Sequence, residues 1–327
     1  MNQVHNLEAL IEFKERIHAL GLLPLWDRQV KLVPGSDCVV AHWPYQQMRP
    51  LLDEATQLIS KKDAERRVLV MENPSLRGTS FIANSLFAGQ QIILPGEFAF
   101  SHRHTPNALR FLVEGAGAYT SIDGHKVPMS PGDFVVTPSW SWHDHGNEGE
   151  EAVVWMDGLD TPFTSLFGAH FRENYSAQTF PVKQVPVDQA QPLIFPFKKI
   201  SAILKERAND ESLCDPAHGF KYVYSNEVSG EFAFKTMAAF MQLLPSNFAG
   251  SIYRSTESSV FNVAQGSCYI DLEDQTLHLQ EHDVVVIPSW KKYQFRSSQN
   301  CMLFSFSDRA AQKTLGFWQE EYLSKSS

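Results

Sequence analysis

The sequence predicts an all-β chain of two related antiparallel barrels, preceded by a helical extension. From Arg67 onward, apolar runs of strand length follow one another, and no helix-length segment separates the first of them. Gly, Pro and Asp-Gly turn signals divide these runs, which are rich in β-branched and aromatic residues, as is typical of a sandwich or barrel. A second block repeats the pattern of the first. This duplication accounts for a length of 327 residues, beyond the roughly 250–300 at which a single core stops growing.

The segment before the first barrel is expected to be mainly helical. Apolar residues recur at helical spacing over residues 7–20 and again from Arg49 to Ser60. Between the barrels, a polar stretch rich in Pro and Lys indicates a connecting region with a helix near Ile200–Ala208, and a final helix is expected over residues 310–323. The predicted organisation is 1–66 for the N-terminal helical extension, 67–173 for the first barrel, 174–231 for the connecting region, and 232–327 for the second barrel with its C-terminal helix.

Composition excludes several functional classes. A formal net charge of −9 is unfavourable for a nucleic-acid or anionic-membrane partner, because such partners favour a basic face. No apolar run approaches the ~20 residues of a membrane span, and the N-terminus lacks the pattern of a secretory signal. The four cysteines are widely scattered without a CxxC pair, as expected of reduced thiols. We therefore expect a cytoplasmic protein.

Histidines occur at metal-ligand spacing in the first block. His102 and His104 are two residues apart, which places both imidazoles on one face of a strand. His143 follows a later strand and a Pro-Ser-Trp turn, and an antiparallel pairing could bring it opposite the first two. A His-x-His pair alone indicates a solvated basic patch more often than a metal site. The interpretation therefore depends on the rest of the pattern.

The second block supplies an internal control for these histidines. AFSHRHTPNALRFLVEG aligns with GSIYRSTESSVFNVAQG, and PGDFVVTPSWSWHDHG aligns with EHDVVVIPSWKKYQFR. At the three histidine positions the second block carries Tyr253, Ser255 and Tyr293. Because the strand pattern persists while the histidines are absent, we infer that they serve a metal site in the first barrel and are not needed for the fold.

The wider spacing matches a double signature. Its positions are filled by Gly96, His102, His104, Gly115, Gly132, Pro138, His143 and Asn147. This resembles the cupin barrel, a small jelly roll (double-stranded β-helix) whose inward-facing histidines hold a metal. The chain departs from the pattern where many cupins supply a glutamate ligand, here Ala108 or Leu109, and at Trp140, where the signature has glycine. Three neutral imidazoles leave open positions that favour an anionic bidentate substrate, and they suit iron, zinc or another first-row ion.

A resemblance to a narrower family extends over nearly the whole chain. HRHTPNALRFLVEGAGAYTSIDG, PGDFVVTPSWSWHDHGN and VWMDGLDTP, together with LPLWDR and LGFWQEE, resemble gentisate 1,2-dioxygenase and its relatives acting on salicylate and 1-hydroxy-2-naphthoate. The resemblance implies a bicupin whose first barrel holds non-haem Fe(II) on His102, His104 and His143 and whose second barrel has lost its metal. Gentisate would chelate the iron through its carboxylate and adjacent hydroxyl group, and ring opening with O2 would give maleylpyruvate. It also suggests a homo-oligomer, a tetramer by analogy with the family.

Further site residues follow from the same resemblance. Arg110 and Arg66 are expected to bind the substrate carboxylate, although Arg110 could be a surface arginine and Arg66 a solvated charge at a helix end. His145 is expected to act as an acid or base near substrate and oxygen. Gln91 and Asp157 match polar residues of the family's pocket, and Asp157 is expected to orient a histidine or an arginine.

Three alternatives remain at the level of sequence. A salicylate or 1-hydroxy-2-naphthoate dioxygenase would share the metal site, and no single residue separates these substrates from gentisate. A bicupin sensor could hold a metal and an aromatic acid without turnover. Three histidines and a water also form a known zinc arrangement for hydrolysis.

Overall fold

The computed structural model describes residues 2–60, 65–182, 193–226 and 229–323, and the chain divides into two units, residues 1–34 and 35–327. The first unit contains α1 (Asn2–Ala19) and the 3-10 turn η1 (Leu25–Asp27), and Lys14 forms an ion pair with Asp27. The helix predicted over residues 7–20 thus begins earlier than expected. Among the described helices, none has the length and apolar character needed to cross a membrane.

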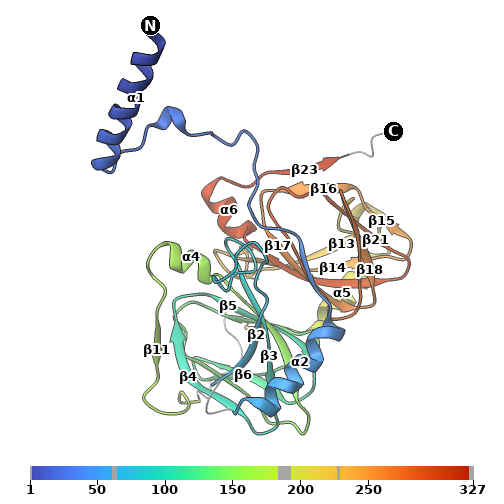
Figure 1. Cartoon of the computed structure of the whole chain (residues 1–327). Helices are drawn as coiled ribbons and strands as arrows, with labels where there is room; N and C mark the ends of the chain where they lie inside the picture. Colours follow the sequence, from blue (N-terminus) through green and yellow to red (C-terminus); the bar gives the residue numbers. More distant parts are fainter. Residues whose placement is uncertain (1, 61–64, 183–192, 227–228, 324–327) are drawn as a thin grey trace. The chain divides into compact units, whose positions relative to one another are not determined.

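The first barrel is built from two sheets, coloured cyan to green in Figure 1. The larger sheet has the strand order β12 (Ile194–Phe195), β8 (Phe134–Thr137), β5 (Ala108–Glu114), β10 (Val153–Leu159), β3 (Phe87–Ile93) and β2 (Arg67–Val70). The smaller sheet has the order β11 (Arg172–Asn174), β4 (Phe98–His104), β9 (His143–Asn147), β6 (Ala118–Ile122) and β7 (His125–Pro128). Neighbouring strands are antiparallel, as expected of a jelly roll.

The second barrel repeats this plan. Its larger sheet has the order β1 (Ala41–Trp43), β20 (Val284–Ile287), β17 (Ser259–Gln265), β22 (Cys301–Ser307), β14 (Ala238–Leu244) and β13 (Phe220–Tyr224). Its smaller sheet has the order β19 (Thr276–Leu279), β18 (Cys268–Leu272), β21 (Tyr293–Ser297), β16 (Ile252–Ser255) and β23 (Glu320–Leu323), and β15 (Phe248–Ala249) pairs with β21. The duplication seen in the sequence is therefore also a duplication of strand order.

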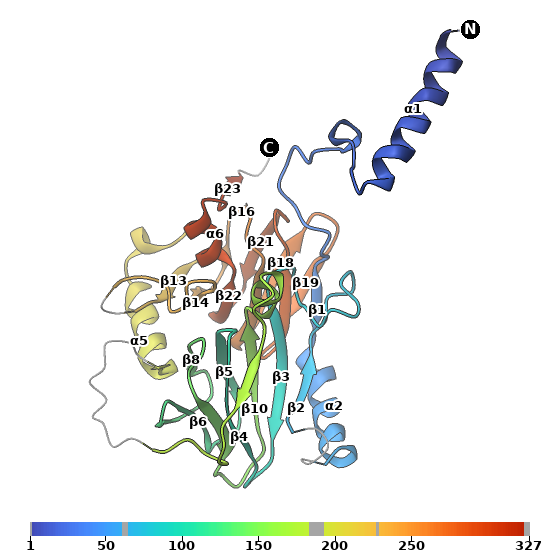
Figure 2. The ribbon, with the colours of Figure 1, turned by 90° about the vertical axis from the view of Figure 1, so that its left-hand side faces the viewer.

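The two larger sheets pack against each other, so that one apolar core joins the barrels (Figure 2). Phe111 of β5 stacks on Phe304 of β22, with ring centroids 4.3 Å apart. Residues on the opposite faces of these strands point into the barrels, where Leu112 and Trp155 belong to the inner core of the first and Leu303 of β22 to that of the second. The strands are therefore apolar on both faces, which explains their near-continuous hydrophobic runs.

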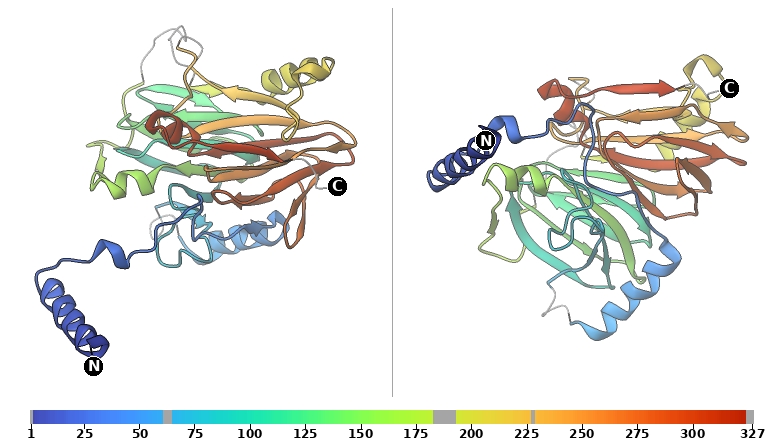
Figure 3. Two further views of the ribbon diagram at one scale, coloured as in Figure 1. Left: turned by 90° about the horizontal axis from the view of Figure 1, so that it is seen from above. Right: turned by 45° about the horizontal axis from the view of Figure 1, so that its top comes forward.

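Helices cover the edges of the barrels (Figure 3). They are α2 (Tyr45–Leu58), α4 (Thr161–Leu166), α5 (Phe197–Arg207), α6 (Arg309–Leu315) and the 3-10 turn η2 (Glu211–Leu213). The buried face of α2 (Tyr45, Met48 and Leu52) packs on the shared core. α2 begins four residues before the predicted Arg49, and α5 begins three before the predicted Ile200.

The predicted C-terminal helix over residues 310–323 is wrong in its second half. α6 ends at Leu315 because Gly316 has a φ of 75°, in the left-handed region that favours glycine. The chain then enters β23, which pairs with β16. A composition suited to a helix therefore gives way to a strand because the edge of the sheet offers it hydrogen bonds.

Strands also come from the segments outside the two predicted barrels. β1, inside the predicted helical extension, pairs with β20 of the second barrel. From the predicted connecting region, β12 pairs with β8 and β13 pairs with β14. Residues 183–192 of that region lie outside the described residues. Each flanking segment thus completes the edge of a sheet.

Candidate metal centre

The three histidines singled out in the first block converge on one point. β4 carries His102 and His104, and His143 opens β9 as the register partner of His102. The ring centroid of His143 lies 4.3 Å from that of His102 and 4.7 Å from that of His104. One ring nitrogen from each residue can be chosen such that all three lie within 4.8 Å of one another. Among the described residues, no other group of three His, Cys, Asp or Glu side chains meets this condition.

Hydrogen bonds fix the orientation of all three rings. Each Nδ1 lies 2.8–2.9 Å from a backbone carbonyl, from His102 to Phe100, from His104 to Pro106 and from His143 to Ser141. Since a carbonyl can only accept, each Nδ1 carries the proton and each Nε2 presents a lone pair. The Nε2 atoms of His102 and His143 are buried and have no hydrogen-bond partner in the described part of the chain. Buried nitrogens with free lone pairs fit a metal ion, and such carbonyl bonds are typical of metal-bound histidines.

The surroundings keep these imidazoles neutral. Burial lowers the pKa of His102 to about 2 and the pKa of His104 to about 4, and it lowers that of His143 well below its ordinary value. Neighbouring charges act in the same direction, Arg66 on His102 and Arg110 on His104. The rings are therefore in the form that binds a metal at neutral pH without first losing a proton.

The second barrel places hydrogen-bonded tyrosines at the same register. Tyr253 of β16 pairs with Tyr293 of β21, as His102 pairs with His143. Nε2 of His218 lies 3.0 Å from the Tyr293 hydroxyl, and the Tyr253 hydroxyl donates to Glu320 over 2.8 Å. The sequence comparison placed tyrosines at these positions, and here they form a network of side-chain hydrogen bonds.

Trp140 occupies the signature's glycine position, in the turn that precedes His143. Trp140 has a φ of 65°, in the region that glycine adopts without strain, and its counterpart Trp290 has the same value. The Arg103 guanidinium lies 4.4 Å from the Trp140 ring centroid and 4.5 Å from that of Trp142. This stacking holds the turn beside β4 in spite of its unfavourable backbone.

Arg110 is buried inside the first barrel. It lies on β5 of the larger sheet, whereas His102 and His104 lie on β4 of the smaller sheet. Its Nη1 donates to Thr137 over 3.0 Å, and its Nε lies 3.3 Å from Oδ1 of Asp157, its register partner on β10. Burial lowers the pKa of Arg110, and the Asp157 carboxylate opposes that shift. The alternative of a surface arginine does not hold.

His145 and Gln91 form a second polar pair inside the barrel. Nε2 of Gln91 lies 3.2 Å from Nε2 of His145, and His145 Nδ1 is buried with no hydrogen-bond partner within the ranges that the structure describes. Burial is the largest cause that holds the pKa of His145 well below its ordinary value. Asp157 accepts a hydrogen bond from the Trp155 indole over 3.1 Å. Its contacts thus favour orientation of Arg110 over orientation of a histidine.

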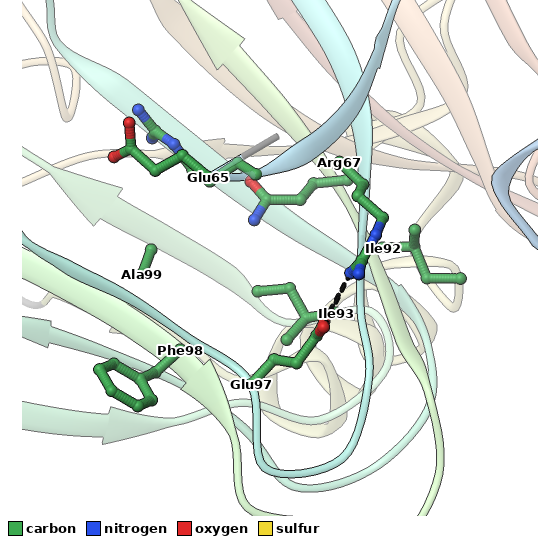
Figure 4. Close-up of a pocket in the computed structure, with 9 residues that line it drawn as sticks. Glu65, Arg67, Ile92, Ile93, Glu97, Phe98 and Ala99 are labelled. Atoms are coloured by element: carbon green, nitrogen blue, oxygen red, sulfur yellow. Dashed lines mark hydrogen bonds and ion pairs between the residues drawn. The ribbon is translucent and has the colours of Figure 1, made fainter. Parts of the chain in front are cut away.

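Arg66 directly precedes β2 and is half-buried, and residues 61–64 lie outside the described part of the chain. It lines a small pocket with Gln91, Phe98 and Ala99, and Figure 4 shows this pocket in close-up. Ala99 is the register partner of His145, so the pocket adjoins the polar pair. Burial lowers the pKa of Arg66, and this arginine lowers the pKa of His102, His104 and His145.

Sequence reasoning missed three residues of this region. Thr137 fixes Arg110 from β8, and Arg172 and Glu65 form an ion pair beside Arg66. Thr137 could have been found from the strand pattern, since it ends an otherwise apolar run before a proline. Glu65 and Arg172 are 107 residues apart and carry no motif, so nothing local indicates that they meet.

Comparisons with known proteins agree with this architecture. The family model described as "Cupin domain" matches residues 89–159, which contain the three histidines. Gentisate 1,2 dioxygenase 1 of Aquipseudomonas alcaligenes is 40% identical, over 94% of this chain and 95% of the relative. The 1-hydroxy-2-naphthoate 1,2-dioxygenase of Nocardioides sp. (strain KP7) is 32% identical, over 85% of this chain and 78% of its own.

Solved structures show the same relationship. The salicylate 1,2-dioxygenase of Pseudaminobacter salicylatoxidans superimposes with a TM-score of 0.86 at 27% identity, covering 95% of this chain and 96% of its own. A structure of this enzyme described as adducts with gentisate superimposes with a TM-score of 0.88 at 26% identity, covering 97% and 94% of the two chains. The similarity therefore extends over both barrels.

Proposed function

The chain belongs to the gentisate 1,2-dioxygenase family of ring-cleaving bicupins, and we propose that it converts gentisate and O2 to maleylpyruvate with Fe(II) at the first barrel. The observation that carries this proposal is that metal-binding imidazoles and positive charge occur together in the first barrel. Three neutral imidazoles with free Nε2 lone pairs lie within the field of the two guanidinium groups of Arg66 and Arg110. Such a site combines a metal face with the positive charge that an aromatic carboxylate requires.

The metal would be held by His102, His104 and His143 through their Nε2 atoms. Bound Fe(II) would supply the redox coupling between an electron-rich ring and O2. The protein holds the three imidazoles neutral and correctly rotated before the metal arrives, because carbonyl groups fix their Nδ1–H bonds.

Arg110 and Arg66 would bind and orient the substrate carboxylate. Arg110 is held in one orientation by Thr137 and Asp157, so it is preorganised for a fixed anion position. Its charge is buried, where an interaction with an anion is stronger than in water. A carboxylate held in this way directs one edge of the aromatic ring toward the histidines.

His145 would move a proton at Nδ1. Gln91 occupies its Nε2, and Nδ1 has no hydrogen-bond partner among the described residues, which leaves that atom for a ring hydroxyl of the substrate. Ring opening inserts both atoms of O2 and needs no external reductant, because gentisate plus O2 has the composition of maleylpyruvate. One proton transfer at the substrate hydroxyl oxygen is consistent with a single acid–base residue.

A salicylate or 1-hydroxy-2-naphthoate dioxygenase is the second candidate, favoured by the structural match to a salicylate 1,2-dioxygenase. The test follows the near-ultraviolet absorbance of the conjugated keto-acid product with each of the three substrates, with and without added Fe(II). We expect the highest kcat/KM with gentisate, because its second hydroxyl donates electron density to the ring. Faster turnover of salicylate would reverse the assignment. Binding without turnover of any substrate would favour a sensor, and zinc instead of iron in protein purified without oxygen would favour a hydrolase.

The proposal includes a homo-oligomer and a cytoplasmic location. Both are supported by the kinship with catabolic ring-cleaving enzymes. Light scattering on the purified chain measures the first, and fractionation of the producing cells measures the second.

A further inference from the structure

The two residues that flank Arg66 in sequence form ion pairs with the first barrel. Arg67 forms an ion pair with Glu97, with Nη1 and Oε2 2.8 Å apart, immediately before β4. Glu65 forms an ion pair with Arg172 of β11, with distances of 2.6 Å from Nη2 to Oε1 and 3.3 Å from Nη1 to Oε2. In Figure 4 the side chains of Glu65 and Arg67 diverge, and Arg67 extends toward Glu97. Arg66, between them in sequence, is thus bracketed by two ion pairs.

The register of β11 places Arg172 beside the histidines. Arg172 is the register partner of His104 on β4. The second barrel has the same arrangement, where Glu320 of β23 is the register partner of Ser255. There Glu320 accepts a hydrogen bond from Tyr253, which stands at the position of a metal ligand. Arg172 is exposed, and it lies at the register from which Glu320 reaches a ligand position in the second barrel.

Glu65 separates two positive charges. Burial lowers the pKa of Arg66, the charge of Arg172 lowers it further, and the Glu65 carboxylate raises it. Without that carboxylate, the two guanidinium groups would repel each other. Glu65 also has a φ of 53°, which residues other than glycine rarely adopt, so its position requires contacts such as this ion pair.

We propose that Glu65 and Arg172 are positioning residues for substrate binding, whose ion pair holds the Arg66 guanidinium where it meets the carboxylate of the aromatic acid. The inference rests on the proposed function, in which Arg66 binds that carboxylate. Arg172 does not itself contact the substrate, because Glu65 engages it through two nitrogens and Asn174 accepts from its Nε over 2.8 Å.

The experiment compares five variants of the Fe(II)-loaded protein with the wild type. They are Glu65→Gln, Arg172→Gln, the double variant, the exchange Glu65→Arg with Arg172→Glu, and Lys126→Gln as a control. Lys126 forms an exposed ion pair with Glu148 in the same barrel, so it matches the test pair in kind. The dissociation constant of gentisate is measured by calorimetry without oxygen, and kcat and KM are measured in air.

We expect each single variant to raise the dissociation constant and KM about fivefold, with kcat within about twofold of wild type. The double variant should match a single variant, since the pair acts as one unit, and the exchange should restore wild-type binding to within about twofold. Lys126→Gln should bind like the wild type.

Unchanged binding in both single variants, or effects that multiply in the double variant, would overturn the positioning role. Tighter binding in Glu65→Gln would also overturn it, because Arg172 would then be a direct substrate ligand. The two proposals fail separately. If the wild-type protein binds gentisate without turnover, the dioxygenase proposal is refuted, and the binding measurements still test the role of Glu65 and Arg172. If it binds none of gentisate, salicylate and 1-hydroxy-2-naphthoate, both proposals are refuted.

Discussion

His102 and His143 are register partners on adjacent strands of the first barrel, with ring centroids 4.3 Å apart. In the second barrel the same register pairs Tyr253 with Tyr293. The backbone therefore provides the same geometry twice, and side-chain identity alone decides which barrel can hold a metal. This separation of fold from chemistry makes the site testable by substitutions that leave the barrel intact.

Replacing His143 with asparagine should remove the metal without unfolding the protein. Asparagine lacks the imidazole lone pair, and the two remaining histidines are too few to hold the metal firmly. We expect iron content to fall at least about tenfold and turnover to be lost. Elemental analysis after anaerobic loading measures the change, with His125→Asn, outside the three-histidine group, as the control. Wild-type iron content in His143→Asn would contradict the ligand assignment.

Arg110 and Asp157 should behave as a coupled buried pair. Arg110→Met leaves the Asp157 carboxylate buried without its cation and should lower the free energy of unfolding by about 3–5 kcal/mol. Adding Asp157→Asn should recover part of that loss, because the stranded charge is removed. Substrate affinity should stay low in both variants. Urea denaturation and KM are the measurements, and recovery of KM in the double variant would argue against a carboxylate role for Arg110.

Gln91 should influence turnover through His145. Gln91→Leu removes the side chain that lies 3.2 Å from His145 Nε2, so the ring loses its fixed orientation. We expect kcat to fall about tenfold or more, with KM within about threefold of wild type. Gln90→Leu is the matched control, since Gln90 is a buried neighbour on the opposite face of the same strand. Equal effects of the two variants would indicate a general packing defect.

The metal-free protein should lose stability as the pH falls below the ordinary histidine pKa of about 6.5. Burial holds the pKa of His102 near 2 and that of His143 well below normal, so the unfolded chain binds protons that the folded chain does not. Each such histidine contributes up to about 1.4 kcal/mol per pH unit, and this slope persists down to the folded-state pKa.

The comparison with His143→Asn isolates this effect. The raised pKa of Asp144, about 6, opposes the slope between about pH 6 and 4, but it acts in both proteins. The variant should therefore show a shallower loss of stability between about pH 6.5 and 4. If the free energy of unfolding fell equally steeply with pH in the two proteins, a neutral, buried His143 would be contradicted.

The sequence predicted the barrels and the three histidines because their signals are local and repeated. Strand alternation places His102 and His104 on one face, and Tyr253 and Ser255 in the second block show that the fold does not need them. Family resemblance supplied Arg110, Arg66, Gln91, His145 and Asp157. The structure adds the contacts of these residues, which cannot be predicted from their spacing in the sequence.

What the sequence could not predict depends on long-range pairing. Residues 320–323 have helical composition, yet they form a strand because β16 offers an unpaired edge. Arg172 lies in a polar stretch without a motif, and it reaches the site because β11 pairs with β4. In both cases the structure of the segment depends on the strand with which it pairs.

The most direct test is oxygen consumption by anaerobically purified protein loaded with Fe(II) and mixed with gentisate. A three-histidine dioxygenase consumes one O2 per gentisate and forms one conjugated keto-acid product, and His104→Ala abolishes both while keeping the wild-type circular dichroism spectrum. Absence of oxygen uptake by the iron-loaded protein with gentisate, salicylate and 1-hydroxy-2-naphthoate, or undiminished uptake in His104→Ala, would contradict ring cleavage at the first barrel.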